Sequence, residues 1–541
     1  MKWHQVWHQL LRQDSKHFST AREAVRQSPD APRVLMATGI GGYPVGALLE
    51  SSLAVALTMR GAIVDFLVCD GVLPACQQSD AGDLPATPGR WPQPRCEKCF
   101  TQGSACLEPL GLDVLRYGDY LDSDTRSWAR HLASAIQFEE IAAFELDGLS
   151  VGEHAYAGAL RYFARGDLAN EPGRDAVLRA YFESALLTVR CVQRLLDERH
   201  YAVACFHHGI YVPQGLVGEV CRSRGVRVVN WNPAYRDHCF VFSHDDSYHR
   251  TMISEPVAAW ENLDLTPAMQ EELEGYLEDR RTGRGDWIWF HTAGEGRSTL
   301  SARTPAVDST RPFITLLTSV IWDARLHYDS NAFENMMDWV CATIDYFAAH
   351  PGLQLVIRVH PAEISGNIPS RQTVVAELKV RFEELPPNVL LVPPESPVST
   401  YDLIASSQAV LLYNTKTGIE IASRGIPVVV AGDAWIRNKG FSLDASSEEE
   451  YLRILDTVAT LPRLDEATRR RALKYAYHFF FRRMIPISFV HSREKFQFEL
   501  SLRGVRDLLP GQDSGLDCVC DGILHGTPFV FDQVNSDHVV I

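Results

Sequence analysis

The sequence lacks any apolar run of the roughly 18 to 20 residues that a membrane-spanning helix requires. It also lacks a long basic run, and 68 acidic residues outnumber 52 basic ones, which gives a formal net charge of -16. These absences argue against a membrane-embedded protein and against a nucleic-acid-binding surface. Residues 1–11 show neither a signal-peptide core nor a cleavage site, so we expect a cytoplasmic protein.

No short repeat or low-complexity tract interrupts the 541 residues, of which 46% are hydrophobic and 22% charged. This composition predicts a globular protein, and the length suffices for two or more domains. One apolar stripe, formed by Trp3, Val6, Trp7, Leu10 and Leu11, follows helical spacing. It would either pack on the body of the protein or rest on the inner face of a membrane, so peripheral membrane association is an alternative.

The first half alternates strand-like and helical patterns. Residues 33–37 predict a buried strand, 46–60 a helix and 62–68 a second strand, which together make a βαβ unit that opens a parallel sheet. A second unit of this kind is predicted at residues 201–230. Residues 69–106, rich in Pro, Gly, Gln and Cys, interrupt the pattern and are interpreted as an insertion.

The second half repeats the alternation of strand and helix. Apolar runs predict strands at 313–317, 354–358, 389–392, 409–412 and 427–430. The fold class is therefore α/β, with two Rossmann-like, doubly wound domains and a cysteine-containing insertion in the first.

The domain boundaries follow from shifts in composition. Residues rich in Arg, Gly, Ser and Thr lie between the two α/β halves and predict an interdomain connection. The predicted division is a helical lead-in at 1–30, a first α/β domain at 31–274, the connection at 275–311, a second α/β domain at 312–470, and a crossing helix with a tail at 471–541.

Polar loops follow the strands of the second half. They supply hydroxyls, cations, carboxylates and an indole from Thr318, Ser319, Arg358, His360, Glu363, Thr415, Lys416, Thr417, Gly418, Glu420, Trp435, Arg437 and Lys439. Because the carboxyl ends of parallel strands meet at one edge of a sheet, these loops predict one nucleotide-binding or phosphate-binding edge.

Different residues in these loops suit different parts of a nucleotide. His360 can donate to a phosphate or act as an acid that assists its departure. Thr417 and the N–H of Gly418 can hold phosphate while Lys416 supplies charge, and Glu420 can accept hydrogen bonds from a ribose diol. The alternative is structural, with turns, packed tryptophans and a capping box that joins Thr417 and Glu420.

The loops resemble the donor-binding domain of GT-B glycosyltransferases of bacterial capsule and surface-polysaccharide biosynthesis, whose Arg-x-His-Pro and Gly-x-Glu-type loops hold a nucleotide sugar. The resemblance spans residues 312–451. It implies that His360 and Thr417, with Gly418, contact phosphate and that Glu420 contacts ribose. It also implies a CMP- or UDP-linked donor, a carbohydrate or lipid-linked glycan acceptor bound by the first domain, and catalysis without a metal or another cofactor.

The first half carries weaker signals. Gly41 and Gly42 lie in a turn that is no Gly-x-Gly-x-x-Gly fingerprint, so a dinucleotide site is disfavoured. The resemblance places this turn on the acceptor side, where an acceptor could approach the backbone. Asp147, Glu153 and His208 are candidate general bases for deprotonating an acceptor hydroxyl.

Twelve cysteines are many for a reducing compartment, where they favour metal sites or buried thiols over disulfides. Cys76, Cys96, Cys99 and Cys106 fall within the insertion, and four thiolates could hold a structural zinc ion. An iron–sulfur cluster and unliganded thiols are the alternatives.

The combined hypothesis is a glycosyltransferase that moves a sugar from a nucleotide-sugar donor to a carbohydrate acceptor in surface-polysaccharide biosynthesis. Two other functions fit the same patterns, because a fold does not fix a reaction. A nucleotide-sugar epimerase or hydrolase would turn over the donor without an acceptor. A non-catalytic polysaccharide-assembly protein would bind no nucleotide.

Overall fold

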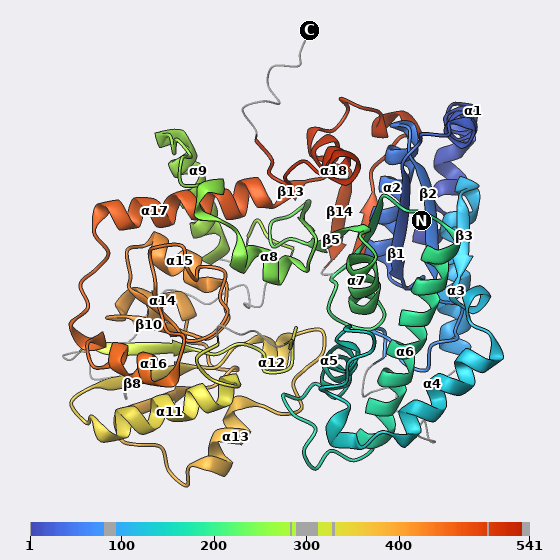
Figure 1. Ribbon diagram of the computed structural model, residues 1–541. Coiled ribbons are helices and arrows are strands. Elements are labelled where there is room, and N and C mark those ends of the chain that lie inside the picture. The colour runs from blue at the N-terminus through green and yellow to red at the C-terminus, as the bar shows by residue number, and fades with distance from the viewer. Residues whose placement is uncertain are drawn as a thin grey trace. The chain divides into compact units, whose positions relative to one another are not determined.

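The computed structural model describes residues 2–79, 93–281, 284–287, 312–326, 331–494 and 497–532. The chain divides into two compact units, which are described separately (Figure 1). Unit 1 comprises Met1–Phe163, Leu168–Thr251 and Phe481–Ile541, and unit 2 comprises Ala164–Asp167 and Met252–Phe480.

Among the described residues, unit 1 contains a seven-stranded sheet with the order β13-β6-β5-β4-β1-β2-β3. The strands are β1 (Arg33–Gly39), β2 (Ile63–Val68), β3 (Asp113–Arg116), β4 (Val203–His207), β5 (Arg227–Pro233), β6 (Cys239–His244) and β13 (Ile485–Pro486). Strands β1 to β5 pair in parallel, whereas β6 and β13 add antiparallel pairs at one edge. The order reverses between β1 and β4, as in a doubly wound fold.

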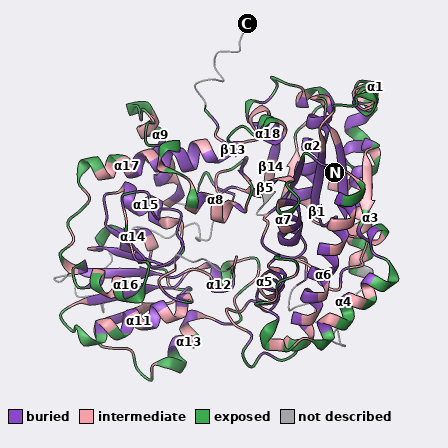
Figure 2. Cartoon of the chain, in the orientation of Figure 1, coloured by how far each residue is buried: buried purple, intermediate pink, exposed green. Residues whose placement is uncertain are grey.

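Helices flank this sheet and leave β1, β2, β4 and β6 almost wholly buried, which explains their largely apolar sequences (Figure 2). The edge strand β3 is not buried. They are α1 (Val6–Gln27), α2 (Pro44–Met59), α3 (Gln93–Leu107), α4 (Ser123–Ala135), α5 (Val151–Phe163), α6 (Arg174–Glu198), α7 (Gln214–Ser223), α8 (Tyr248–Ser254, which ends in unit 2) and α18 (Ser514–His525). Strands β14 (Val490–Glu494) and β15 (Gln497–Leu500) form a separate hairpin.

The apolar stripe of α1 packs inward. Trp7 is fully buried, and its indole N–H donates to Ser51 Oγ of α2 at 2.7 Å. Val6 and Leu10 are buried beside it. Of the two readings of this stripe, packing on the protein body is therefore the one that the structure shows. No described helix is both long enough and apolar enough to cross a bilayer.

The described part of unit 2 contains a six-stranded, all-parallel sheet with the order β12-β11-β10-β7-β8-β9. The strands are β7 (Phe313–Leu317), β8 (Gln354–Arg358), β9 (Val389–Val392), β10 (Val410–Leu412), β11 (Val428–Val430) and β12 (Leu443–Asp444). The five predicted strands are confirmed, and the predicted fold class with two doubly wound sheets is correct.

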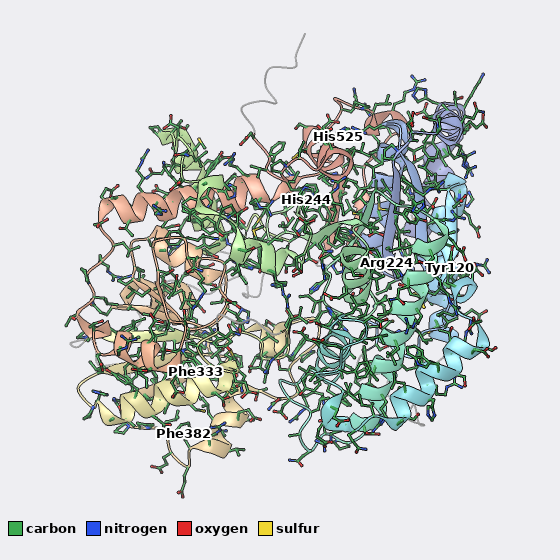
Figure 3. All side chains as sticks on the ribbon, in the orientation of Figure 1. Tyr120, Arg224, His244, Phe333, Phe382 and His525 are labelled. Carbon is green, nitrogen blue, oxygen red and sulfur yellow. The ribbon has the colours of Figure 1, made fainter. Side chains whose placement is uncertain are left out.

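Helices of unit 2 pack around this sheet. They are α9 (Pro267–Arg281), α11 (Met336–Ala349), α12 (Ala362–Ser365), α13 (Val374–Arg381), α14 (Thr400–Ser406), α15 (Thr417–Ser423), α16 (Glu448–Leu455) and α17 (Glu466–Tyr477). Phe333 belongs to the buried core here (Figure 3). Its carbonyl accepts a 2.8 Å hydrogen bond from the hydroxyl of Tyr413.

The division into units differs from the predicted boundary at 275–311. Residues 252–281 join unit 2, because Lys439 Nζ donates to the carbonyls of Ile253 and Glu255 at 3.0 and 2.6 Å and α9 packs on α17. Residues 481–541 return to unit 1, where β13 pairs with β6. Most of the connection, residues 288–311, lies outside the described residues.

Candidate functional site

The carboxyl edge of the unit 2 sheet has a topological switch point between β7 and β10. The chain runs from β7 to β8 on one side, whereas β10 continues to β11 on the other. Ser319 follows β7 and donates from Oγ to Asn414 Oδ1, which follows β10, at 2.6 Å. Loops that diverge at such a point form the usual ligand crevice of open α/β sheets.

His360 lies at the same edge, after β8. Its backbone N–H donates to Thr318 Oγ1 at 3.0 Å, so the loops after β7 and β8 are also joined. Its ring nitrogen Nδ1 accepts a hydrogen bond from the backbone N–H of Ala362 at 3.0 Å. A neutral imidazole that accepts at Nδ1 carries its proton on Nε2, so His360 can donate from that atom.

The predicted hydroxyls after β10 are also adjacent. Thr415 Oγ1 and Thr417 Oγ1 lie 3.1 Å apart, and both side chains are half-buried. The structure thus gathers Thr318, Ser319 and His360 with the Thr415–Thr417 segment along three adjacent strands. This set can donate several hydrogen bonds to one anionic group.

Gly418 is required for packing. A Cβ at this position would lie 2.5 Å from Ile436 Cδ1 and 2.7 Å from Leu412 Cδ1. The glycine therefore allows α15 to approach β10 closely, as glycines do at the start of helices in nucleotide-binding folds. The capping-box alternative is not formed, because α15 begins at Thr417 with Lys416 as its N-cap and Glu420 bonds elsewhere.

Glu420 is buried in a cluster of charged groups, and the predicted contact with ribose does not fit this position. Its Oε2 accepts from the Tyr401 hydroxyl at 2.8 Å. Its Oε1 lies 2.6 Å from Lys416 Nζ and 3.3 Å from Arg280 Nη2. Both carboxylate oxygens are thus used inside the protein, because an apolar surrounding would otherwise leave the charge unpaired.

The cluster continues to Asp286, which pairs with Arg280 and accepts from the Tyr276 hydroxyl at 2.7 Å. Burial by itself would raise the pKa of Glu420, but the Arg280 and Lys416 cations hold that pKa well below its usual range. Burial lowers the pKa of Lys416, with Arg280 contributing. Sequence reasoning missed Arg280 and Asp286, since neither follows a strand.

Arg358 and Glu363 also point into the protein. Arg358 donates to the carbonyls of Pro393 and Ser396 and to Thr400 Oγ1, so it holds the loop after β9. Glu363 is fully buried, and its Oε1 accepts from the N–H of Val374 at 3.2 Å. Burial raises the pKa of Glu363 to about 7. The predicted contact with a nucleotide-sugar donor requires side chains that face the sheet edge, and neither of these two does.

The loop after β11 folds inward with its predicted donor-binding residues. Arg437 is 1% exposed and donates to the carbonyls of Gly432 and Ala445. Lys439 is also 1% exposed, and burial lowers its pKa to about 8. Trp435 is buried and packs on Phe479. These three side chains stabilise unit 2 instead of presenting cations and an indole at its edge.

Gly41 and Gly42, predicted to face an acceptor, are covered by α3. A Cβ on Gly41 would lie 2.6 Å from the carbonyl oxygen of Cys99, and one on Gly42 would lie 3.1 Å from its Sγ. The N–H of Gly42 donates to that Sγ at 3.0 Å. The glycines therefore permit close packing of a helix, and the prediction of an acceptor contact does not hold in this structure.

The three candidate bases occupy different places. Asp147 is more than half exposed and pairs with Arg190 at 3.3 Å. Glu153 lies in the first turn of α5. His208 follows β4 at the carboxyl edge, and burial, followed by the nearby Arg161 cation, lowers its pKa to about 3. Of the three, His208 is the one placed directly after a parallel strand.

Beside His208 lies a buried polar group that the sequence did not reveal. Thr38 donates to Glu50, whose Oε1 also accepts from Trp231 Nε1 at 2.8 Å. His207 Nε2 lies 3.3 Å from the Tyr43 hydroxyl. Burial raises the pKa of Glu50 to about 7. The signal in the sequence that could have indicated this cluster is Glu50, which is the single charged residue of α2.

The predicted zinc ligands do not assemble. Cys96, Cys99 and Cys106 lie on one continuous helix, α3, and Cys106 is about 10 Å along the axis from Cys99. A zinc ion needs every thiolate within about 2.3 Å, so these four cysteines cannot share it. Among the described residues, no group of three or more His, Cys, Asp or Glu side chains could hold a metal ion.

Comparison with solved structures returns distant similarities. The beta Kdo 2,4 transferase of Thermosulfurimonas dismutans KpsC is 13% identical, with 57% of this chain and 87% of that chain covered and a TM-score of 0.35. The beta Kdo 2,7 transferase of the same protein is 12% identical, with 52% and 78% covered and a TM-score of 0.31. The UDP-GlcNAc 2-epimerase of Neisseria meningitidis is 9% identical, with 83% and 98% covered and a TM-score of 0.24. Scores this low carry no argument about function.

A search of curated proteins finds no match. A family model described as capsule polysaccharide biosynthesis protein matches residues 289–477, which include β7 to β12 and the loops at the switch point. The predicted resemblance is thereby confirmed for this segment. This chain is thus similar to capsule polysaccharide biosynthesis proteins over residues 289–477.

Proposed function

We propose that this protein is a GT-B-type glycosyltransferase of capsule polysaccharide biosynthesis, with a nucleotide-sugar donor bound by unit 2. The observation that carries the proposal is the joining of three loops at the switch point, through the Ser319–Asn414 and Thr318–His360 hydrogen bonds. Three loops held together at this edge offer a preorganised set of hydrogen-bond donors. The family match over the same segment supports this reading.

The phosphate of the nucleotide sugar would be bound by uncharged hydrogen-bond donors. His360 can donate from Nε2, and the hydroxyls of Thr415 and Thr417 lie at the neighbouring loop. Lys416 contributes less net charge than the sequence suggested, because Glu420 pairs with it. We therefore assign stabilisation of the departing phosphate to hydrogen bonds that are fixed before the reaction, which is the arrangement that lowers a barrier most effectively. In this proposal catalysis needs no metal ion.

The acceptor would be a carbohydrate or a lipid-linked glycan, which unit 1 would bind from the cytoplasmic side of the membrane. His208 is the base we favour, because it follows β4 at the carboxyl edge and its lowered pKa leaves the imidazole neutral. A neutral imidazole can accept a proton from an acceptor hydroxyl.

The experiment is a transfer assay with purified protein and a panel of CMP-, UDP-, GDP- and dTDP-linked sugars. We expect acceptor-dependent release of one nucleotide, and a loss of about 100-fold or more in kcat for His360→Ala at unchanged melting temperature. Release without any acceptor would instead indicate an epimerase or hydrolase. Absence of binding to every nucleotide would indicate an assembly protein and overturn the proposal.

A double-mutant cycle tests directly whether the hydrogen bond between Ser319 and Asn414 matters for donor binding. Ser319→Ala and Asn414→Ala should each raise the donor KM, and the double variant should add little to either, because the two side chains act through one hydrogen bond. Ser365→Ala, which removes an exposed hydroxyl bound only to the carbonyl of Pro361, is the control. Additive effects of the two substitutions would contradict the joint role.

A further inference from the structure

A polar pocket lies in unit 1, at the end of the sheet where its parallel strands begin. This end is opposite to the carboxyl edge of the same sheet. Its walls include Arg22, Arg26, Arg33, Asp65 and Asp113. Arg33 and Asp113 are the first residues of β1 and β3, and α1 packs beside this end of the sheet (Figure 1). The pocket is therefore formed entirely within unit 1.

The two carboxylates of the pocket are already fully engaged. Asp65 is buried and accepts from Arg33 at 2.8 Å, from Arg199 at 3.0 Å and from the Tyr201 hydroxyl at 2.7 Å. Asp113 lies 3.1 Å from both Arg26 and Arg199. The pocket walls thus hold three guanidinium groups and two carboxylates, and both carboxylates also pair with Arg199, which is not part of the walls. Positive charge is therefore in excess here, on a chain whose net charge is -16.

Arg22 carries part of this excess. Its Nη1 donates to the carbonyl of Leu110 at 2.7 Å, and its buried Nε has no hydrogen-bond partner among the described residues. No carboxylate in the described part of the chain pairs with it within 4.0 Å in the way that Asp65 pairs with Arg33. A buried N–H of a cation without an acceptor is costly, and a bound anion would remove that cost.

The backbone leaves room for this guanidinium. Gly111 has a φ of +59°, and a Cβ at this position would lie 2.0 Å from Arg22 Nη1. Any side chain at Gly111 would displace Arg22 from the pocket. The position thus requires glycine for two independent reasons, its backbone conformation and the space that Arg22 occupies.

We infer that this pocket is a binding site for a small phosphate-bearing molecule. Guanidinium groups match the geometry of phosphate oxygens through paired hydrogen bonds, and the excess of positive charge favours an anionic ligand. The site is separate from the donor site of unit 2, so its occupancy does not depend on the proposed transferase reaction.

The test measures binding of inorganic pyrophosphate and of inorganic phosphate to the full chain by titration calorimetry. We expect a site that Arg22→Gln and Arg26→Gln each weaken about ten-fold or more, because each removes a charge-assisted hydrogen bond. Arg130→Gln, which removes another exposed arginine that pairs with Glu183 at 3.6 Å, is the matched control and should leave binding unchanged. Potassium chloride at equal ionic strength corrects for general screening.

Two further arms make the result decisive. His360→Ala should retain the Arg22-dependent site, because that variant alters unit 2 alone. Arg26 is about half exposed, so Arg26→Gln should fold even if Arg22→Gln does not. Unchanged binding in Arg26→Gln, loss of binding only in His360→Ala, or no binding at millimolar pyrophosphate would each overturn the inference.

Discussion

Glu420 Oε1 and Arg280 Nη2 lie 3.3 Å apart, and both side chains are almost fully buried. The contact ties the first turn of α15 to the end of α9, two elements separated by more than a hundred residues of sequence. Lys416 pairs with the same carboxylate, so a buried charged cluster fixes the segment that carries Thr415 and Thr417. The position of the predicted phosphate loop therefore depends on residues outside it.

Removing Arg280 should be strongly destabilising. Arg280→Ala leaves Glu420 and Asp286 buried with one cation fewer, and breaking a buried pair in this way costs roughly 3 to 5 kcal/mol. Unfolding by urea measures the change. Arg284→Ala, which removes an exposed arginine that pairs with Asp279 at 3.0 Å, should cost less than about 1 kcal/mol. Equal costs for the two variants would show that the cluster adds no stability.

Gly418→Ala should destabilise unit 2 by about 1 to 3 kcal/mol, because the new Cβ would lie 2.5 Å from Ile436 Cδ1. Ile436→Val in the same chain should recover part of that loss by shortening the opposing side chain. Gly352→Ala is the control, since no heavy atom lies within 4 Å of a Cβ there. The packing role would be refuted by an unchanged free energy of unfolding in Gly418→Ala.

Glu363 should make stability depend on pH. Burial raises its folded pKa to about 7 from the ordinary value of 4.5, so between these values the folded protein holds a proton that the unfolded chain has released. Stability from this group is therefore present below pH 4.5 and falls as pH rises towards 7. Glu363→Gln keeps an acceptor for the Val374 N–H and removes the titration.

The Glu363→Gln variant should gain roughly 2 to 3 kcal/mol relative to the parent protein between pH 4.5 and pH 8. Urea unfolding at the two pH values measures this gain. Glu384→Gln changes an exposed carboxylate and serves as control. If the difference between Glu363→Gln and the parent were the same at both pH values, Glu363 would not be the titrating group.

The cysteines of α3 should bind no structural metal. Because Cys99 and Cys106 lie two helical turns apart, we expect much less than one zinc per chain by elemental analysis of protein purified without chelator. The melting temperature should not change after treatment with a chelator. Stoichiometric zinc, lost together with stability in Cys96→Ser and retained in Cys341→Ser, would contradict this expectation.

The sequence by itself determined the two α/β sheets and the position of the switch-point loops. Short, largely apolar runs such as Phe313–Leu317 and Gln354–Arg358, alternating with helical patterns, predict strands of a parallel sheet, and the polar residues that follow such strands lie at the carboxyl edge. In the structure, Thr318 and Ser319 follow β7 and His360 follows β8.

Tertiary structure alone decided which of those polar side chains face the edge. Spacing along a loop does not fix the direction of a side chain, so Arg437, Lys439 and Glu420 could have pointed either way. Lys439 and Glu420 turn inward because groups from distant segments, the carbonyl of Ile253 and the guanidinium of Arg280, satisfy them there. Arg437 turns inward to the carbonyls of Gly432 and Ala445, which its own loop brings around it. Contacts between residues so far apart in the sequence produce no local sequence pattern, so they cannot be predicted from it. For the same reason, the pocket that contains Arg22 could be recognised only in the folded structure.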